Sequence, residues 1–528
     1  MPRYPLLYEL NTRVRLSELA AALGRPATLD DVTDAELDRL GRDGFDLVWL
    51  LGVWQTGEAA RRVSATNPEW LAEYHRVLPD FRESDVCGSC FAVRDYHVHA
   101  DFGGDEALAR LRERLRERGL RLVLDFVPNH VAPDHPWVER HPEFFIAGTE
   151  EQILSQPENY RRLDAASGSR ILACGRDPYF AGWPDTLQLN YGNVALQNAL
   201  LGELQRIAHQ CDGVRCDMAM LVLPEIFERT WGIPTQPLWP RATAAVRAEV
   251  SDFLFLAEVY WDLEWTLQQQ GFDFTYDKRL YDRLVDGAAR PVREHLVAGP
   301  DFQGRLARFL ENHDEPRAAA TFAPDVHCAA AVITYLTPGL RFFHQGQREG
   351  RRVRIPTHLG RGPVEAVEAE IAAFYDALLA CLRDPSFRDG QWQLLEARPA
   401  WQGNETNDAF IAFSWTGPGD LRHLVAVNYA DHRSQCYLML PWLDLSGRTW
   451  RLQDRLGNAV YDRDGADLCA MGLYLDVPAW GHHAFDVQPA LPASPGEIGA
   501  SEKTRPEGTS LGHDGALGHL VAESQGRR

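Results

Sequence analysis

Acidic, imidazole and guanidinium side chains recur at the ends of four short apolar runs in the middle of the chain. The four segments are LVLDFVPNH (122–130), GVRCDMAM (213–220), FLFLAEVYW (253–261) and RFLENHDEPR (308–317). Each has the length and composition of a buried strand that ends where the ionisable residues begin. The carboxyl ends of the strands in a parallel barrel meet at one mouth, so we expect these side chains to converge there. They are Asp217, Glu258, Asp314, Arg215, His130 and His313.

Two carboxylates in unlike environments can cleave a glycosidic bond. Arg215 and Asp217 are two residues apart, so in a strand both side chains point to the same face, where the guanidinium would keep Asp217 ionised. A structural buried ion pair is the alternative for these two residues. Glu258 follows the apolar run FLFLA and precedes Tyr260 and Trp261. Desolvation by such neighbours raises the pKa of a carboxyl group, as a general acid requires, whereas the alternative is a surface glutamate at a strand end.

The third acid, Asp314, lies in the motif N-H-D-E-P. These residue types also suit the capping of a helix N-terminus, so capping is an alternative for this segment taken alone. Its place after the apolar run RLARFLE and beside the other three segments favours a catalytic role.

In order and spacing the four segments resemble the signature regions of the α-amylase family of retaining glycoside hydrolases and transglycosidases. The resemblance extends from about residue 8 to residue 487. It implies that Asp217 is the nucleophile and that Glu258 is the general acid/base. It also implies that Asp314 stabilises the transition state.

The resemblance implies roles for further side chains around these acids. Arg215 would orient the nucleophile, and His130 and His313 would bind hydroxyls of the attacked sugar. Phe91, in the segment GSCFAVRDY, stands where the family usually has a tyrosine that stacks on this sugar. Asp125 corresponds to the family's scaffolding carboxylate, and we expect it to act as a hydrogen-bond hub under the substrate site.

Tryptophan rings are further candidates to line sugar subsites, because flat apolar rings match the faces of sugars. We consider Trp54, Trp183 and Trp261 in this role, with ordinary packing as the alternative for each.

A calcium site is frequent in the resembling family, and Asn129 matches one of its ligands. Relatives often carry a Lys-His pair shortly after the nucleophile, whereas this chain has Met220 and Leu221 there. Gln188 stands where the family has an aspartate ligand. Calcium prefers six to eight oxygens with several carboxylates. We therefore expect no metal and no other cofactor, and we expect the missing lysine to alter the side of the cleft that receives the leaving group or acceptor.

The rest of the chain alternates strand-like and helical segments, as a (β/α)8 TIM-type barrel requires. The eight predicted strands cover residues 6–10, 45–54, 120–127, 212–219, 253–260, 272–276, 305–312 and 340–345. An amphipathic helix is predicted over residues 105–118, where Leu108, Leu111 and Leu115 recur at helical spacing before Gly119.

Composition shifts predict the domains. We expect residues 1–130 and 194–393 to form the barrel, with a short inserted subdomain at 131–193 after the third strand. Residues 394–487 alternate as the strands of a C-terminal antiparallel β-sandwich do, and residues 488–528 have the composition of a disordered tail.

Composition also limits the partners and the cell compartment. The 528 residues carry a formal net charge of −21, which argues against nucleic acid or an anionic membrane surface as the main partner. Membrane-span and signal-peptide patterns are not evident, and nine cysteines, an odd number, favour reduced thiols in the cytoplasm. The pair Cys87 and Cys90 forms the one C-x-x-C motif, for which we expect loop packing rather than metal or redox chemistry.

We therefore predict an α-retaining glycosidase that acts on α-glucosidic bonds of oligosaccharides by double displacement through a covalent glycosyl-enzyme. A transglycosidase that uses the same residues for glucosyl or maltosyl transfer or for isomerisation is the main alternative. An inactive amylase-like scaffold protein and a metal-dependent hydrolase are two more remote hypotheses. Linkage and chain-length preference stay open at this point, since a fold does not determine a substrate.

Overall fold

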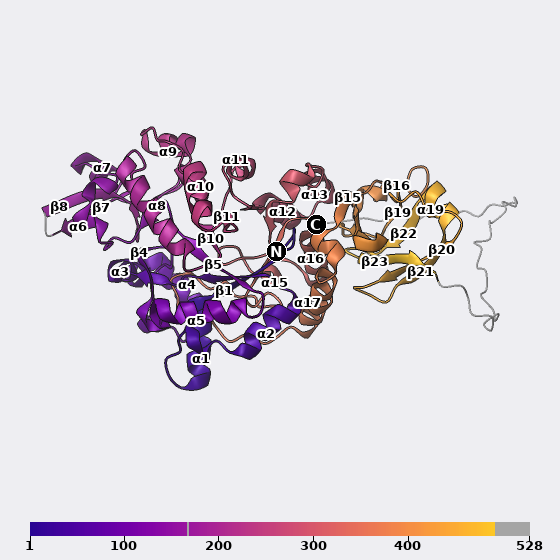
Figure 1. Cartoon of the computed structure of the whole chain (residues 1–528), viewed down its shortest axis with the longest axis horizontal. Helices are drawn as coiled ribbons and strands as arrows, with labels where there is room; N and C mark the ends of the chain where they lie inside the picture. Colours follow the sequence, from indigo (N-terminus) through magenta and orange to yellow (C-terminus); the bar gives the residue numbers. More distant parts are fainter. Residues whose placement is uncertain (166–167, 491–528) are drawn as a thin grey trace, which may run out of the picture. The chain divides into compact units, whose positions relative to one another are not determined.

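The computed structural model describes residues 1–165 and 168–490, and residues 1–489 form one compact unit (Figure 1). In this described part eight parallel strands close into a barrel in the order β1-β14-β13-β12-β11-β10-β5-β2. Their bounds are β1 (Leu6–Asn11), β2 (Leu47–Leu51), β5 (Arg121–Phe126), β10 (Gly213–Cys216), β11 (Leu254–Ala257), β12 (Phe274–Tyr276), β13 (Leu306–Arg308) and β14 (Leu340–His344). Each strand lies within or beside its predicted run, so the predicted fold class is confirmed.

Helices follow the barrel strands and cover their outer faces. The main ones are α1 (Thr12–Leu23), α2 (Asp34–Asp43), α5 (Gly104–Arg116), α8 (Val194–Ala208), α10 (Trp239–Glu249), α12 (Lys278–Asp286), α16 (Pro324–Leu336) and α17 (Ala369–Leu382). In α5 the predicted stripe of Leu108, Leu111 and Leu115 is buried. Gly119 follows the helix with a φ of 72°, a left-handed conformation that favours glycine.

Two excursions leave the barrel near its mouth. Between β2 and β5 the chain forms α3 (Glu58–Thr66) and α4 (Pro68–Val77), together with the paired strands β3 (Trp54–Thr56) and β4 (Val93–Val98). Between β5 and α8 the short strands β6 (His130–Val131) and β9 (Leu187–Gln188) pair, and β7 (Tyr160–Ala165) pairs with β8 (Gly168–Ala173). The helices α6 (Trp137–Arg140) and α7 (Glu150–Ser155) complete this insertion.

The C-terminal part consists of two antiparallel sheets, drawn in orange and yellow in Figure 1. The larger sheet contains β15 (Gln391–Leu394), β17 (Phe410–Thr416), β18 (Arg422–Asn428), β23 (His482–Pro489), β20 (Thr449–Asp454) and β21 (Val460–Asp464). The smaller one contains β16 (Ala397–Pro399), β19 (Ser434–Leu438) and β22 (Leu473–Val477). Phe410, Phe485 and Leu438 belong to a separate hydrophobic core shared by both sheets, as in a sandwich.

The predicted tail begins slightly too early. Gln488 and Pro489 belong to β23, because they pair with Arg451 and Trp450 of β20. Of the rest of the predicted tail, residues 491–528 lie outside the described residues.

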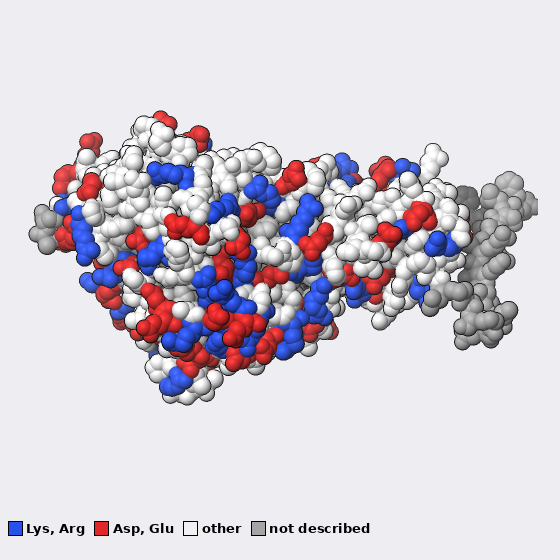
Figure 2. Space-filling model, viewed as in Figure 1, with Lys and Arg blue, Asp and Glu red and all other residues white. Residues whose placement is uncertain are grey.

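Charges of both signs mix over the face shown in Figure 2. Helices α2 and α5 illustrate the mixing, since Arg114 of α5 and Arg118, which lies just after α5, form ion pairs of 3.0 Å with Asp34 of α2. Within the described ranges no helix has the length and apolarity needed to cross a membrane.

Candidate active site

A cavity of about 330 Å³ lies at the mouth of the barrel and is lined by all three predicted catalytic acids. Asp217 and Glu258 are 4% and 3% exposed, whereas the side chain of Asp314 is 42% exposed. The other lining residues are Trp70, Ser89, Phe91, His130, Trp183, Asp185, Thr186, Met218, Tyr260, Thr357 and His358. Its volume is near the lower end of the range for small-molecule sites, about 300–1,000 Å³.

The ends of β10 and β11 hold the first two acids in place. Asp217 directly follows β10, and its backbone N–H donates to the Phe126 carbonyl at 2.9 Å. Glu258 directly follows β11, and its N–H donates to the Cys216 carbonyl at 3.1 Å. The hydrogen-bond ladder of the barrel therefore continues to both residues and fixes their direction.

Arg215 contacts both of these acids. Its Nη1 lies 2.7 Å from Asp217 Oδ1, and its Nη2 lies 2.7 Å from Glu258 Oε2. The guanidinium is fully buried, and the ring centroids of Trp49 and Phe91 lie 5.2 and 5.1 Å from its central carbon. One cation thus binds both acids.

Burial and the neighbouring anions favour the neutral form of Glu258. Burial raises the pKa of Glu258 to about 7, with Arg215 opposing the shift and the anions Asp217 and Asp314 adding to it. Met218 N donates to Oε2 at 2.7 Å, and the Tyr260 hydroxyl donates to Oε1 at 2.8 Å. These contacts fix the carboxyl group within the cavity.

Asp217 is buried beside the same cation. Burial raises its pKa, and Arg215 opposes this both by its charge and by its hydrogen bond. Because Arg215 donates a hydrogen bond of 2.7 Å to Asp217 Oδ1, we assign the ionised form to Asp217.

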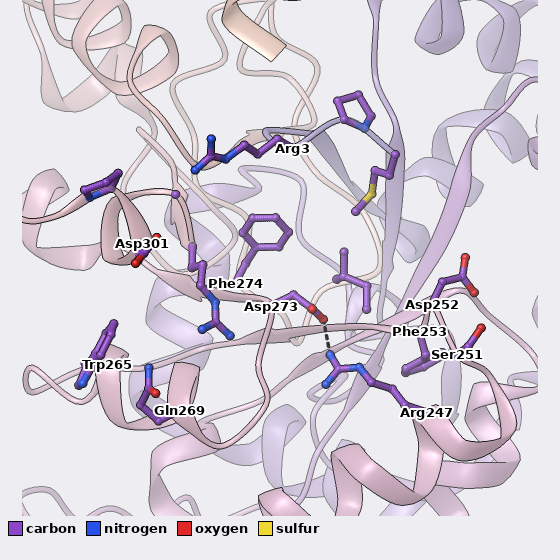
Figure 3. A pocket seen from close by; sticks show the side chains of 16 residues that line it. Arg3, Arg247, Ser251, Asp252, Phe253, Trp265, Gln269, Asp273, Phe274 and Asp301 are labelled. Atoms are coloured by element: carbon purple, nitrogen blue, oxygen red, sulfur yellow. Dashed lines mark hydrogen bonds and ion pairs between the residues drawn. The ribbon is translucent and has the colours of Figure 1, made fainter. Parts of the chain in front are cut away.

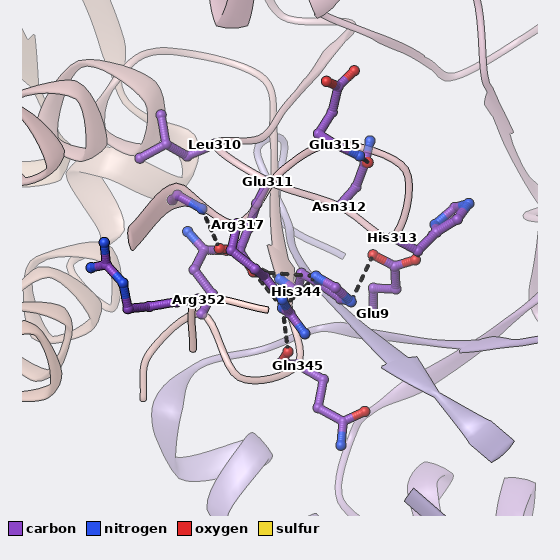
Figure 4. Close-up of polar contacts among 12 residues, drawn as sticks. Glu9, Leu310, Glu311, Asn312, His313, Glu315, Arg317, His344, Gln345 and Arg352 are labelled. Atoms are coloured by element: carbon purple, nitrogen blue, oxygen red, sulfur yellow. Dashed lines mark hydrogen bonds and ion pairs between the residues drawn. The ribbon is translucent and has the colours of Figure 1, made fainter. Parts of the chain in front are cut away.

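Asp314 belongs to a row of alternating charges with His313 and Glu9, and Figure 4 labels the last two of these residues. Its Oδ2 lies 2.9 Å from His313 Nε2, and His313 Nδ1 lies 2.5 Å from Oε1 of the fully buried Glu9 on β1. Burial alone would lower the pKa of His313, but Asp314 and Glu9 raise it to about 10. Burial raises the pKa of Asp314, but the charge and hydrogen bond of His313, together with the charges of Arg215 and Arg354, lower it to about 2.

The capping alternative for N-H-D-E-P does not hold, because the next described helix, α15 (Ala318–Thr321), begins after the motif and has Arg317 at its N-cap. Asn312 Oδ1 accepts hydrogen bonds from the N–H groups of Asp314 and Glu315 at 2.9 and 2.8 Å. The carboxyl group of Asp314 instead contacts His313 and lines the cavity.

The predicted sugar-binding residues divide into two groups. Phe91 and His130 line the cavity, and burial lowers the pKa of His130 to about 4, so its imidazole is neutral. His313 lies behind Asp314, with the Phe91 ring centroid 5.3 Å from its own.

Asp125 and Trp261 lie outside the cavity lining, a position that was expected for Asp125 as a hub under the site but that differs from the sugar-binding role considered for Trp261. Asp125 is buried beneath the site, where it accepts hydrogen bonds from Trp49 Nε1 at 3.0 Å and Gly52 N at 2.7 Å. This is the position of a hydrogen-bond hub, and burial raises its pKa to about 6. Trp261 packs edge-on against Tyr179 at 5.0 Å, and Trp54 is fully buried with its Nε1 donating to the Asp125 carbonyl, so packing describes both rings.

Sequence reasoning missed Glu9 and much of one cavity wall. The acid in the middle of the apolar run LLYEL was a usable signal for Glu9. Trp70, Asp185, Thr357 and His358 come from α4, from the insertion and from the segment after β14, and no motif marks them.

The residues at the family's calcium position do not fit that ion. Gln188 Nε2 donates hydrogen bonds of 3.0 Å to both the carbonyl and the side-chain oxygen of Asn129, and one of 3.1 Å to the Leu189 carbonyl. An amide donor thus lies among the oxygens that a cation would need, and Gln188 supplies no negative charge.

A larger cavity of about 670 Å³ lies near the amino-terminal ends of β11 and β12 (Figure 3). Arg3, Trp265 and the ion pair of Arg247 with Asp273 line it. The predicted site residues are absent from its described lining, so the acids identify the smaller cavity as the candidate active site.

Comparison with known proteins agrees with this geometry. The family model for "Alpha amylase, catalytic domain" matches residues 44–272. Alpha-amylase MalA of Haloarcula japonica is 24% identical over 337 residues, which are 62% of this chain and 42% of that protein. An α-1,4-glucan:maltose-1-phosphate maltosyltransferase of Cereibacter sphaeroides is 44% identical over 147 residues, 26% of this chain and 20% of that protein. The chain spans 42% and 58% of the length of the first two curated relatives that it matches.

Solved structures agree on the fold. The maltogenic α-amylase AmyB of Thermotoga neapolitana has a TM-score of 0.64 at 18% identity, covering 92% of this chain and 99% of its own. The acarbose complex of the Geobacillus thermoleovorans α-amylase has a TM-score of 0.63 at 19% identity, covering 92% of this chain and 98% of its own. By its sequence match over residues 44–272, its closed barrel and the acids at the mouth of that barrel, this chain is similar to the α-amylase family.

Proposed function

We propose that this protein is an α-retaining glycosidase that acts on α-glucosidic bonds of oligosaccharides. The observation that carries the proposal is that Asp217 and Glu258 share Arg215 in one cavity while the pKa of Glu258 is raised to about 7. An ionised nucleophile and a neutral acid are the two forms that double displacement needs.

In the first step Glu258 gives its proton to the leaving oxygen as the bond from that oxygen to the anomeric carbon breaks. Asp217 forms a bond to the same carbon and yields a covalent β-glycosyl-enzyme. In the second step the Glu258 carboxylate takes a proton from water or from an acceptor hydroxyl. That oxygen then bonds to the anomeric carbon, Asp217 leaves, and the α configuration is restored. Asp314 and the neutral His130 would hold the sugar hydroxyls throughout.

The cavity lining supports a neutral sugar substrate over a sugar phosphate. Asp185, Asp217, Glu258 and Asp314 line the cavity, Arg215 and His313 behind the lining neutralise part of their charge, and Lys and Arg are absent from the described lining. A phosphate group would be repelled there, because opposite charges normally recognise it. The named activities of the similar relatives, amylases, maltosyltransferases and trehalose synthases, support α-glucans or their fragments as the substrate class.

Transfer to a sugar in place of water is the second candidate, and one structural feature favours it. After the nucleophile, Met218 lines the cavity and the turn Ala219–Val222 is buried and apolar. The apolar side chain of Met218 in the cavity wall would exclude water and so favour a bound acceptor. Incubation with maltotriose separates the two reactions, because hydrolysis yields only shorter products and transfer also yields longer ones.

We also propose that turnover needs no metal, in line with the misfit at Gln188 and Asn129. Excess EDTA should then leave the rate on maltotriose unchanged, whereas a chelator-sensitive rate would support the metal-dependent alternative.

The nucleophile assignment has a direct test. Asp217→Asn should lower kcat on 4-nitrophenyl α-glucoside or on a maltooligosaccharide by at least about 10³-fold, since it removes the covalent route. The wild-type product should appear first as the α-anomer in NMR spectra. For a retaining enzyme the carboxyl groups of Asp217 and Glu258 should lie about 5–5.5 Å apart. Unchanged turnover in the variant would favour the scaffold alternative or another nucleophile, and an initial β-anomer would refute retention.

A further inference from the structure

Asp185 is a buried acid of the cavity that the mechanism does not use. It is 3% exposed and lines the cavity, and its Oδ2 accepts no hydrogen bond from any described residue. The neighbouring acids differ, since Asp217 has Arg215 and Glu258 has Met218 N and the Tyr260 hydroxyl. A buried acceptor without a donor is costly, and a ligand that brings a donor would offset that cost.

The side chains around Asp185 suit a sugar hydroxyl. His358 Nε2 lies 3.7 Å from Asp185 Oδ2, which is too long for a direct hydrogen bond. A hydroxyl beside this gap can donate to the carboxylate and accept from an N–H at Nε2 at the same time. The His358 ring stacks on Trp70 with centroids 4.2 Å apart and planes at 24°, and both rings line the cavity.

Main-chain bonds hold this wall in position. Cys87 N donates to the His358 carbonyl at 2.9 Å, and Gly360 N donates to the Asp85 carbonyl at 2.8 Å. Asp185 itself follows Trp183, whose N–H donates to the Gly175 carbonyl at 2.7 Å. The acceptor oxygen and the ring platform therefore come from two separately fixed segments.

We propose that Asp185, His358 and Trp70 form a hydroxyl-anchoring subsite for the sugar unit bound in the cavity. Asp185 accepts a hydrogen bond from one of its hydroxyls, His358 donates to the same oxygen, and the Trp70–His358 pair gives an apolar face. The ligand class is a neutral hexose ring, because Asp185 would repel a phosphate or carboxylate substituent at this position. This inference rests on the proposed function and deepens it.

A binding experiment tests the subsite without turnover. In a Glu258→Gln background, calorimetry should show that Asp185→Ala weakens maltotriose binding by about ten- to a hundredfold, the usual effect of losing a hydrogen bond to a charged acceptor. The isosteric Asp185→Asn should weaken it less and serves where the alanine variant does not fold. Asp177→Asn is the matched control, since Asp177 is 7% exposed in the same segment but its Oδ1 already accepts hydrogen bonds from Tyr179 N and Phe180 N. Binding that is unchanged in both folded Asp185 variants would overturn the proposal.

A substrate series identifies the hydroxyl. This series uses protein that keeps Glu258. The kcat/KM of the otherwise unchanged protein should be lower on one of the monodeoxy 4-nitrophenyl α-glucosides than on the parent glucoside. That loss should be about as large as the loss that Asp185→Ala causes on the parent glucoside. Combining that analogue with the variant should cause little further loss, as expected for a single shared contact. Fully additive losses for every analogue would contradict the subsite. If the wild type turns over none of these glucosides or maltotriose while Asp185 still controls maltotriose binding, the proposed function fails and the subsite stands.

Discussion

Opposing electrostatic effects on Glu258 together bring the pKa of its carboxyl group close to neutral pH. Burial raises its pKa to about 7, Arg215 lowers it, and Asp217 and Asp314 raise it. Because the neutral form is the acid, the first step requires a pH below this value. We therefore expect kcat/KM to fall as the pH rises through about 7, measured from pH–rate profiles with maltotriose. A profile that stays level well above that pH would rule out Glu258 as the acid that controls this step.

Glu9 supports Asp314 indirectly, through His313. The raised pKa of His313, about 10, keeps the imidazolium charged over the working range, and Glu9 is one of the two anions responsible. The other charged or titratable groups near His313 are Asp314 on its Nε2 side, Asp217 and Asp125 beyond it, and His344 beyond Glu9.

Glu9→Gln should lower the pKa of His313, because a neutral amide replaces an anion 2.5 Å away. Histidine NMR titration in labelled protein would detect the shift, and kcat should fall as Asp314 loses its fixed cation. Asp277→Asn is the matched control, since Asp277 forms a similar buried pair of 2.9 Å with His295 but does not line the cavity. An unchanged His313 titration in Glu9→Gln would contradict this role.

At the scale of elements, one cavity wall is made of two chain segments that Arg13 of α1 ties together. Its Nη1 donates to the Gly88 carbonyl at 2.5 Å and to the Thr357 carbonyl at 3.4 Å, and it contacts Cys87 Sγ at 3.0 Å. Val86 and Leu359 also form an antiparallel bridge between these segments. The segments carry Phe91 and His358 into the cavity, so Arg13 acts on the site from behind.

Arg13→Met should destabilise the protein by about 1–3 kcal/mol, because the two carbonyls lose a buried donor. It should also raise KM, since the wall residues are no longer held. Urea unfolding and steady-state kinetics measure the two effects. Arg15→Met on the same helix is the control, because Arg15 is partly exposed and pairs with Glu18 and Glu36 at the surface, where ion pairs contribute about 0–1 kcal/mol. Equal losses of stability and equal increases in KM for Arg13→Met and Arg15→Met would show that the contacts of Arg13 with the cavity wall do not support the site.

Site residues could be predicted from the sequence where a pattern of neighbouring residues in the chain identifies them. Asp217 and Glu258 directly follow apolar strands, so strand pattern and residue type locate both. Asp185 and His358 could not be found in this way, because they lie far apart in the chain and meet only through the packing of the insertion against the segment after β14. All eight barrel strands were predictable for the same local reason, as buried runs with turn residues on either side.

At the scale of the whole described unit, the barrel and the sandwich share a buried interface. Trp415 of β17 is fully buried, and its Nε1 donates to the Leu336 carbonyl of α16 at 2.8 Å. Its ring centroid lies 5.6 Å from that of Tyr4, and the Tyr429 hydroxyl donates to the Leu284 carbonyl of α12 at 2.7 Å. We therefore expect the barrel and the sandwich to unfold together in one cooperative transition.

Trp415→Ala should cost about 3–5 kcal/mol of the free energy of unfolding, as large-to-small changes in cores do. Trp401→Ala, at a side chain that is 55% exposed, should stay within about 0.5 kcal/mol of the wild type. Calorimetry should show one transition in all three proteins. Two separate transitions, with only one of them shifted by Trp415→Ala, would mean that the sandwich unfolds independently.

The closure of the barrel between its first and last strands has a consequence for biosynthesis. Leu6 of β1 pairs with Arg341 of β14, so the first strand keeps an unpaired edge until the last strand has left the ribosome. At about 5–20 residues per second this wait lasts roughly 20–70 s. A nascent chain with such an edge is open to intermolecular strand pairing for that time. The yield of soluble protein should consequently depend on chaperone supply and translation speed.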